Sequence, residues 1–158
     1  MSQKIKMLAL DVDGVLTDGG FWWGSGSGPC AEEWKRFSFL DVMGVSLARK
    51  AGLRIALISG EASPLVDRFA IQMGITDVVQ GCKDKAAALR TLAKRHKIAL
   101  RSVAFMGDDV NDLGALKICG LPACPATAHP QVLAVARFVA KRPGGNGAVR
   151  ELVDHLLI

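Results

Sequence analysis

The sequence predicts an α/β protein with a Rossmann-like, doubly wound parallel sheet. Apolar stretches of strand character alternate with stretches of helix character along the 158 residues, half of which are hydrophobic. Three of the apolar stretches are followed by polar residues: Asp11 and Asp13, then Ser59, then Asp108 and Asp109. Because ligands bind at the carboxyl ends of the strands in such sheets, these residues are expected to meet at one edge.

The first strand is expected at residues 5–10, a short apolar run that ends at the loop of Asp11. A β-hairpin flap is expected next, at residues 17–37. Phe21-Trp22-Trp23 and Trp34 lie on either side of a Gly/Ser-rich turn there, which is typical of a hairpin. The flap is therefore inserted directly after the first strand, and the chain is too short for a mobile cap domain.

The remaining elements follow as alternating helices and strands. Helices are expected at about 41–50, 63–73, 84–96, 110–118 and 148–157. Strands are expected at 53–58, 77–80, 102–106, 121–124 and 138–140. Pro64 suits the first turn of its helix and Gly74 its end. Without a repeat or a linker, residues 1–158 are expected to form one domain.

Composition restricts the class of protein. The formal net charge is +5, and many basic residues lie between Lys83 and Arg101, which indicates either the solvated face of a helix or an anion-binding surface. No arginine-rich tract or nucleic-acid motif is present, so no nucleic-acid partner is expected. Asp11 and Asp13 interrupt the first apolar stretch, and no apolar run approaches the roughly 20 residues of a membrane span. Four cysteines without a C-x-x-C pair favour free thiols in a reduced, cytoplasmic protein.

The acidic residues at the strand ends have the chemistry of phosphate-ester hydrolysis. Asp11 offers a carboxylate nucleophile, and Asp13 is placed to protonate the leaving oxygen and then to activate water. Asp108 is the expected third member of a Mg²⁺ site, with Asp109 and Asp112 behind it. A divalent cation would remove the repulsion between such clustered carboxylates.

Ser59, Gly60 and Lys85 are expected to hold the phosphate. The Ser59 hydroxyl and the Gly60 N–H can bind a phosphoryl oxygen, and Lys85 supplies a positive charge. Each feature alone has an ordinary alternative: a turn for the acidic pairs, a helix N-cap for Ser59, a surface lysine for Lys85. Their order along the chain favours the joint interpretation.

The stretch Asp11-Val12-Asp13-Gly14-Val15-Leu16-Thr17-Asp18-Gly19 resembles the first motif of the haloacid-dehalogenase superfamily of phosphatases. Ser59, Lys85 and Gly107-Asp108-Asp109-Val110-Asn111-Asp112 resemble its second, third and fourth motifs. The resemblance implies that Asp11, the main-chain oxygen of Asp13, and Asp108 bind Mg²⁺.

The hairpin and the segment Gly144-Gly145-Asn146-Gly147-Ala148-Val149-Arg150-Glu151 resemble the capless subgroup. That subgroup includes phosphatases of 3-deoxy-D-manno-octulosonate 8-phosphate, an intermediate of lipopolysaccharide biosynthesis, and of nine-carbon keto-sugar-acid phosphates. The resemblance implies a homotetramer in which the flaps meet. It also implies substrate contacts by Glu61, Arg68 and Arg150, although Arg150 has a surface role as its alternative.

Several differences from the octulosonate phosphatases leave the identity of the sugar-acid substrate undecided. The octulosonate enzymes usually carry Arg-Asp-Gly where this chain has Leu40-Asp41-Val42, and they often have a longer C-terminal tail than one ending at Ile158. Glu61 resembles the nine-carbon enzymes more closely, and Arg68 lies about one position from their substrate-binding arginine. The expected function is hydrolysis of the eight-carbon substrate. The alternatives are a nine-carbon substrate, another small phosphorylated metabolite, or a non-catalytic oligomerisation module.

The aromatic residues of the flap allow two arrangements. Phe21, Trp22 and Trp23 are consecutive, so on a strand they cannot all face one side. Either the flap exposes apolar surface for a subunit interface, which is the expected arrangement, or it folds onto the core of its own domain.

Overall fold

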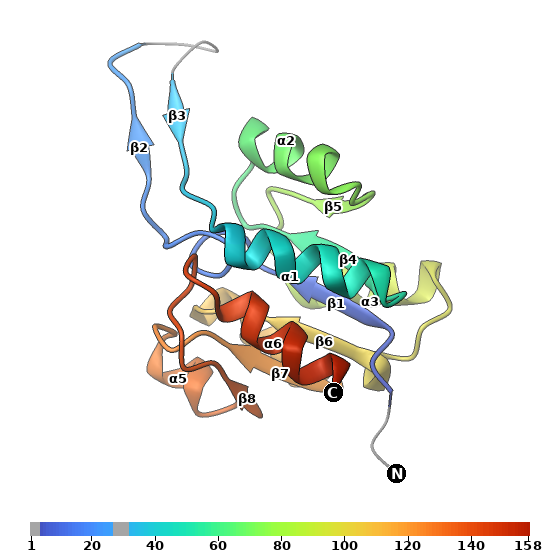
Figure 1. The fold of residues 1–158 in the computed structure, drawn as a ribbon. Helices are drawn as coiled ribbons and strands as arrows, with labels where there is room; N and C mark the ends of the chain where they lie inside the picture. The colour runs from blue at the N-terminus through green and yellow to red at the C-terminus, as the bar shows by residue number, and fades with distance from the viewer. Residues whose placement is uncertain (1–3, 27–31) are drawn as a thin grey trace.

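The structure, a computed structural model, describes residues 4–26 and 32–158 and has the predicted α/β fold (Figure 1). Six strands form one sheet in the order β5-β4-β1-β6-β7-β8, and every neighbouring pair is parallel. The strands are Met7–Leu10 (β1), Arg54–Ile58 (β4), Asp77–Val79 (β5), Val103–Met106 (β6), Leu121–Cys124 (β7) and Phe138–Val139 (β8).

Helices cover both faces of this sheet, and the side chains of β1 alternate between them. Leu8 and Leu10 belong to the core on one face, whereas Met7 and Ala9 belong to the core on the other. The first face is covered by Phe39–Lys50 (α1), Pro64–Met73 (α2) and Ala148–Leu157 (α6). The second is covered by Lys85–Arg95 (α3), Leu113–Ile118 (α4) and Pro130–Leu133 (α5). The central strands are thus buried on both sides, which explains their apolar runs.

Three expectations about helices need correction. The helix expected from Asp41 begins at Phe39, because the Ser38 hydroxyl accepts from the N–H of Leu40 and caps it. The stretch expected as one helix at 110–118 divides into a 3₁₀ turn, Val110–Asp112 (η2), and α4. Helix α5 was not expected, since four residues are too few for a periodic pattern. A second 3₁₀ turn, Leu100–Ser102 (η1), precedes β6.

The expected flap is present and extends from the domain (Figure 1). Its strands, Trp22–Trp23 (β2) and Glu33–Trp34 (β3), pair antiparallel, and part of its Gly/Ser turn lies outside the described residues together with Cys30. The side chains of Trp22 and Trp23 are 66% and 76% exposed. The alternative in which the flap folds onto its own core is therefore wrong.

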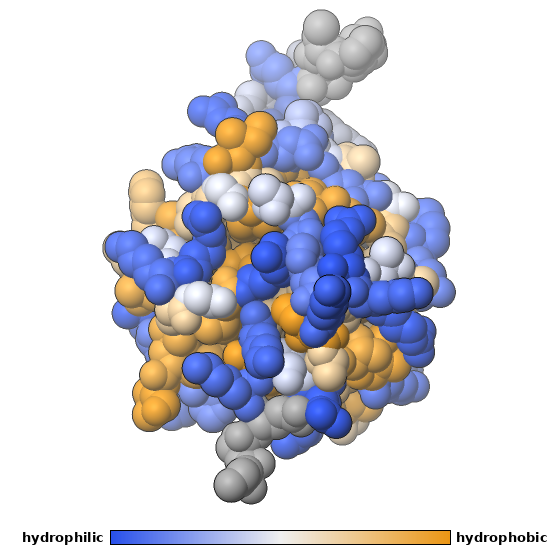
Figure 2. All heavy atoms as spheres, turned by 90° about the vertical axis from the view of Figure 1, so that its right-hand side faces the viewer, coloured by the Kyte–Doolittle hydropathy of each residue, from blue (hydrophilic) through white to orange (hydrophobic). Residues whose placement is uncertain are grey.

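The face at the amino ends of the strands carries many hydrophilic side chains (Figure 2). Lys4, Lys6, Arg49 and Arg54 line a hollow there. On α3 and beside it, Lys83, Arg90 and Lys94 are exposed, as expected for a solvated helix face. Lys85 is the exception, being buried. Within residues 4–26 and 32–158, no helix has the length and apolar character needed to cross a membrane.

Candidate active site

Three carboxylates meet at the carboxyl ends of the two central strands. Asp11 follows β1 and Asp108 follows β6, and these strands are neighbours in a register that pairs Leu10 with Met106. Asp112, at the end of η2, completes the group, and one oxygen of each carboxylate lies within 4.8 Å of the others. Asp11 and Asp112 are buried, with exposed fractions of 5% and 0%.

Lys85 connects two of these carboxylates. Its Nζ lies 2.9 Å from Asp11 Oδ1 and 2.7 Å from Asp112 Oδ1, and its side chain is 1% exposed. Burial lowers the pKa of Lys85, but the charges of Asp11 and Asp112 outweigh burial and raise the pKa above its ordinary value. The ammonium therefore stays charged between two carboxylates, which excludes the surface-lysine alternative.

Asp112 shapes the loop that follows β6. Its Oδ2 accepts from the backbone N–H groups of Asp108 at 2.9 Å and Asp109 at 3.2 Å, while Oδ1 is held by Lys85. Asp109 in turn accepts from the N–H of Val110 and begins η2. Since both oxygens of Asp112 already have hydrogen-bond donors, this residue is suited to orienting the loop behind a ligand.

The cluster carries more negative than positive charge. Burial, followed by the charge of Asp112, raises the pKa of Asp108 to about 6. The same two causes, in the same order, raise the pKa of Asp11 well above its ordinary value, although Lys85 opposes them. Buried carboxylate oxygens are the donors that Mg²⁺ prefers, so the residues present fit such an ion. Asp11 and Asp108 are the residues that would hold it.

Gly14 allows Asp108 to reach this site. Gly14 has φ +84°, and a Cβ at this position would lie 2.0 Å from Asp108 Oδ2. Its N–H donates to Thr17 Oγ1, which is buried and also accepts from the N–H of Gly19. A side chain at position 14 would thus strain the backbone and displace an acidic side chain of the cluster.

The carboxylate of Asp13 is turned toward the flap. Its Oδ1 lies 2.5 Å from the Nζ of Lys35, which is in the chain segment between β3 and α1. The Lys35 side chain is 3% exposed, whereas that of Asp13 is 35% exposed. Sequence reasoning did not identify Lys35, because the two residues are far apart in the chain and belong to no shared motif.

Ser59 and Gly60 follow β4, next to β1. The Ser59 hydroxyl is buried and has no hydrogen-bond partner among the described residues. It does not cap α2, because Ser63 does so by accepting from the N–H of Leu65. A buried hydroxyl left without a protein partner at a ligand edge fits the binding of a phosphoryl oxygen.

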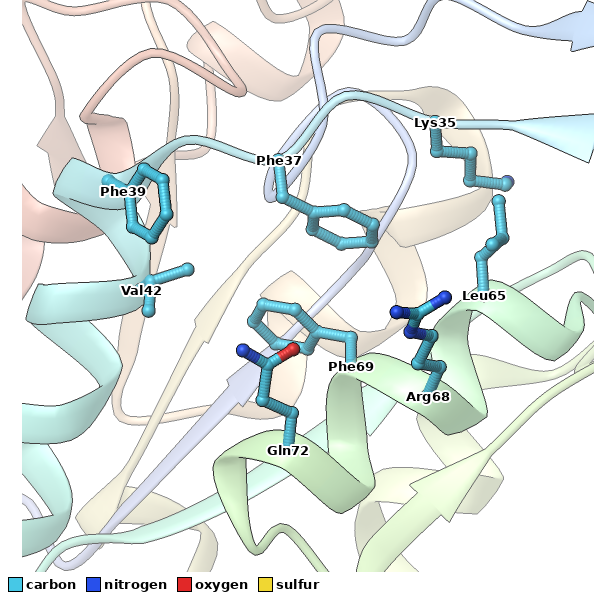
Figure 3. A pocket seen from close by; sticks show the side chains of 8 residues that line it. All are labelled: Lys35, Phe37, Phe39, Val42, Leu65, Arg68, Phe69 and Gln72. Carbon is cyan, nitrogen blue, oxygen red and sulfur yellow. The ribbon is translucent and has the colours of Figure 1, made fainter.

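The substrate residues implied by resemblance lie outside the acidic cluster. Glu61 is exposed directly after Gly60, and Arg68 is exposed on α2. Arg68 lines a cavity of about 260 Å³, in which the rings of Phe37 and Phe69 face each other and Lys35 lies at the same end as Arg68 (Figure 3). On α6, Nε of Arg150 lies 2.8 Å from Asp154 Oδ1.

A glycine loop before α6 supports the loop that follows β1. Gly145 donates its N–H to the carbonyl of Val15 at 2.9 Å. At Gly144, a Cβ would lie 1.8 Å from the carbonyl oxygen of Gly14, so the two loops are in direct backbone contact. Asp41 of α1 holds this loop by accepting from the N–H of Gly147 at 3.0 Å. The resemblance included the glycine segment, but the contact with Asp41 was not expected.

Comparison with known proteins identifies the family. Residues 54–152 match the model of the haloacid dehalogenase-like hydrolases. The chain belongs to this family. It is 37% identical over 157 residues to the 3-deoxy-D-manno-octulosonate 8-phosphate phosphatase of Escherichia coli K12, covering 99% of this chain and 81% of that protein.

Solved structures of phosphatases are similar to this chain in fold. The 3-deoxy-D-manno-octulosonate 8-phosphate phosphatase of Moraxella catarrhalis, in complex with magnesium, phosphate and KDO, has a TM-score of 0.92 and 37% identity. The alignment covers 97% of this chain and 86% of that one. The cobalt-bound phosphatase of Haemophilus influenzae has a TM-score of 0.89 and 33% identity, with 98% and 88% covered. These matches confirm the predicted fold class and the resemblance to haloacid-dehalogenase phosphatases.

Proposed function

We propose that this hydrolase is a Mg²⁺-dependent phosphatase of 3-deoxy-D-manno-octulosonate 8-phosphate. The observation that carries the proposal is the gathering of Asp11, Asp108, Lys85 and Ser59 at one edge of the sheet. This occurs in a chain that matches phosphatases of that substrate over nearly its whole length.

The positions of the side chains suit a two-step transfer. In the first step a carboxylate oxygen of Asp11 bonds to phosphorus, the bond from phosphorus to the sugar oxygen breaks, and Asp13 gives that oxygen a proton. In the second step Asp13 takes a proton from water, whose oxygen bonds to phosphorus and releases Asp11. Ser59, the N–H of Gly60 and Lys85 hold the phosphoryl oxygens in both steps. Bound Mg²⁺ would neutralise charge on the transferring group.

Asp13 also belongs to the proposed metal site, through its main-chain oxygen. Asp109 and Asp112 support that site from behind, with Asp112 acting through its two backbone hydrogen bonds. The contacts of Glu61 and Arg68 with the substrate are part of the same proposal. Both residues are exposed, Glu61 directly after Gly60 and Arg68 in the cavity that Lys35 also lines. For Arg150 the surface alternative gains support, since its guanidinium already pairs with Asp154.

The partner proposed for this chain, besides the sugar acid, is a second copy of itself. A homotetramer assembled through the flap would cover Trp22 and Trp23, which are otherwise exposed. We also propose a cytoplasmic location, supported by the free thiols of Cys82, Cys119 and Cys124. A role in lipopolysaccharide biosynthesis rests on the substrate alone.

The alternative functions differ in what they require of the site. A nine-carbon substrate or another small phosphate ester would use the same transfer chemistry, so only specificity separates these from the proposal. A non-catalytic module gains no support from the structure. Three clustered carboxylates, two of them buried, are costly without a cation or a phosphate partner to use them.

The experiment is a phosphate-release assay with Mg²⁺ on the eight-carbon and nine-carbon keto-sugar-acid phosphates, common sugar phosphates and nucleotides. We expect a kcat/KM for the eight-carbon ester at least about 10-fold above the others, a preference of about 1.4 kcal/mol, and loss of turnover on chelation. Preference for the nine-carbon ester would replace the substrate but keep the reaction. No release from any ester would contradict the proposed function.

A further inference from the structure

The segment that returns from the flap to α1 contacts the rest of the domain through alternate side chains, at α2 and at Asp13. Glu33 Oε1 accepts from the hydroxyl of Ser63, the N-cap of α2, at 2.6 Å. Two residues later Lys35 reaches Asp13, and two residues later again Phe37 stacks on Phe69 at 4.7 Å between ring centroids. This spacing of two is that of an extended chain with one side against the domain. The contacts of Glu33 and Phe37 therefore fix the backbone on both sides of Lys35.

Further contacts fix the ammonium of Lys35. It lies 4.0 Å from Glu33 Oε1 and 5.3 Å from the ring centroid of Phe21, which is on the other arm of the flap. Arg36 anchors the same segment by donating from Nη1 to the carbonyl of Gly145 at 2.9 Å. The side chain of Lys35 is 3% exposed, so its charge faces Asp13 with little competing water.

Asp13 receives no other side-chain hydrogen bond within the part of the chain that the structure describes. Lys35 occupies Oδ1, at 2.5 Å, and Oδ2 is left for a reacting proton. A carboxylate with only one anchor is free to rotate when that anchor is removed, because the Asp13 side chain is 35% exposed. Proton transfer requires the carboxyl oxygen within hydrogen-bond reach of the leaving oxygen.

We propose that Lys35, carried by the flap, is a positioning residue that holds the Asp13 carboxyl in the orientation needed for proton transfer to the leaving group. This rests on the proposed phosphatase function. Lys35 acts through Asp13 and not on the phosphate itself. Through the ion pair of Lys35 and Asp13, proton transfer would therefore depend on the position of the flap.

The test compares two phosphate esters that differ in their need for an acid. The leaving alkoxide of the sugar-acid phosphate needs a proton, whereas the nitrophenolate of p-nitrophenyl phosphate leaves without one. The value of kcat/KM reports on formation of the aspartyl-phosphate, the step in which the leaving group departs. We therefore compare kcat/KM for both esters in the wild type, Lys35→Met, Lys35→Arg, Asp13→Asn, and the double variant of Lys35→Met and Asp13→Asn.

We expect Lys35→Met to lower kcat/KM for the sugar-acid phosphate about 10- to 100-fold, within the roughly 10²- to 10⁴-fold range of general acid catalysis. For p-nitrophenyl phosphate the expected loss is less than about threefold, because no proton is needed. Asp13→Asn should show the same selectivity with a larger loss. The double variant should be no worse than Asp13→Asn, since one residue acts through the other.

Lys94→Met is the matched control, because it makes the same substitution at an exposed lysine on α3, outside the flap. It should leave the ratio of the two kcat/KM values unchanged. If Lys35→Met does not fold, Lys35→Arg carries the test: it keeps the charge but shifts the hydrogen bond, and a selective loss of about 10-fold is expected.

Equal losses for both esters, or multiplicative losses in the double variant, would overturn the role of Lys35 and leave the phosphatase function standing. A wild-type protein that releases no phosphate from either ester would instead overturn the proposed function, and the role of Lys35 with it.

Discussion

At the scale of single residues, the main feature of the site is that most of its charged side chains are buried. Lys85 contacts Asp11 and Asp112 through one ammonium, and Asp108 adds a third carboxylate without adding a cation. The raised pKa values of Asp11 and Asp108 follow from burial and from the neighbouring Asp112. A site of this kind is more stable when a proton or a metal ion is bound than when it is fully ionised.

This gives a prediction about pH and metal. Burial and the charge of Asp112 raise the pKa of Asp108 from its ordinary value of 3.8 to about 6, so between these values the folded state binds more protons than the unfolded one. The contribution of Asp108 to stability is therefore present at low pH and lost as the pH rises through about 6. Asp11, whose pKa is also raised, acts in the same direction. Mg²⁺ at about 100 times its Kd should restore about 2.7 kcal/mol.

We expect Mg²⁺ to raise the Tm of the protein more at about pH 7.5 than at about pH 5, where protons compete for the same carboxylates. Scanning calorimetry or a dye-based melt measures this directly. Asp108→Asn is the control, and it should remove most of the metal effect while leaving the metal-free protein at least as stable at neutral pH. A Tm shift by Mg²⁺ that is equal at both pH values would contradict the assignment of the site.

The residues that the sequence could predict are those whose neighbours are set by strand order. Asp11, Ser59 and Asp108 each follow a strand, and parallel strands bring such positions together whatever the details of packing. Lys35 and Asp41 could not be predicted in this way. Their contacts with Asp13 and Gly147 depend on how the flap and α6 dock, which no local pattern in the chain specifies.

At the scale of elements, one buried carboxylate joins two helices. Asp41 in α1 accepts from the N–H of Gly147 at 3.0 Å and of Arg150 at 3.0 Å, so it serves as a cap for α6. Helix α6 lacks a side-chain cap of its own, because Gly147 stands at its N-cap with φ 105°. The glycine loop that supports the loop after β1 thus depends on α1.

We predict that Asp41→Ala destabilises the protein by about 1–3 kcal/mol, the range for losing a cap and leaving buried N–H groups without an acceptor. Urea unfolding at a fixed protein concentration measures the change. Asp154→Ala, which removes an exposed carboxylate from α6, should change stability by less than about 0.5 kcal/mol. If both variants were equally stable, Asp41 would not be the residue that holds the glycine loop.

The elements that the sequence predicted well are the long ones with a clear apolar pattern. Helices α2 and α3 lie within about a residue of their expected limits, since Pro64, Gly74 and Asp84 mark the boundaries with local chemistry. Helix α5 and the break between η2 and α4 were not predicted. They span only three to six residues each, and the break is fixed by the hydrogen bonds of Asp112.

At the scale of the whole molecule, the flap is the feature that a single domain does not explain. Its Trp22, Trp23 and Trp34 are each more than half exposed. The base of the flap is nevertheless well held, because Glu33 contacts Ser63 at the start of α2 and Lys35 contacts Asp13. A firmly attached arm that carries exposed aromatic residues is suited to contact with another subunit.

We predict that Trp23→Asp weakens self-assembly, because a charge would be buried in an apolar contact at a cost of several kcal/mol. Sedimentation velocity over a range of concentrations would show a shift to smaller species. Ile71→Asp is the matched control, since Ile71 is 81% exposed on α2 and is not part of the flap, and it should leave the distribution unchanged. Identical distributions for Trp23→Asp and wild type would remove the flap from the interface.

The sequence predicted the fold and the reaction class of the whole molecule more firmly than its substrate. The charged residues around Asp11 would act in the same way on any phosphate ester, so they do not indicate which ester is the substrate. Specificity would depend instead on exposed residues such as Glu61 and Arg68, whose proposed contacts with a sugar would be determined by assembly and by the ligand. The sequence of a single chain does not show which residues of another subunit, or which atoms of a ligand, would lie beside these side chains.

The most direct test of the account is phosphate release from 3-deoxy-D-manno-octulosonate 8-phosphate by the wild type and by Asp11→Asn, each with Mg²⁺ and with a chelator. We expect turnover only in the wild type with Mg²⁺, and a loss of at least about 10⁴-fold in a folded Asp11→Asn protein, because its amide cannot form the aspartyl-phosphate. Turnover near the wild-type rate in folded Asp11→Asn, or turnover that persists under chelation, would contradict the central claim.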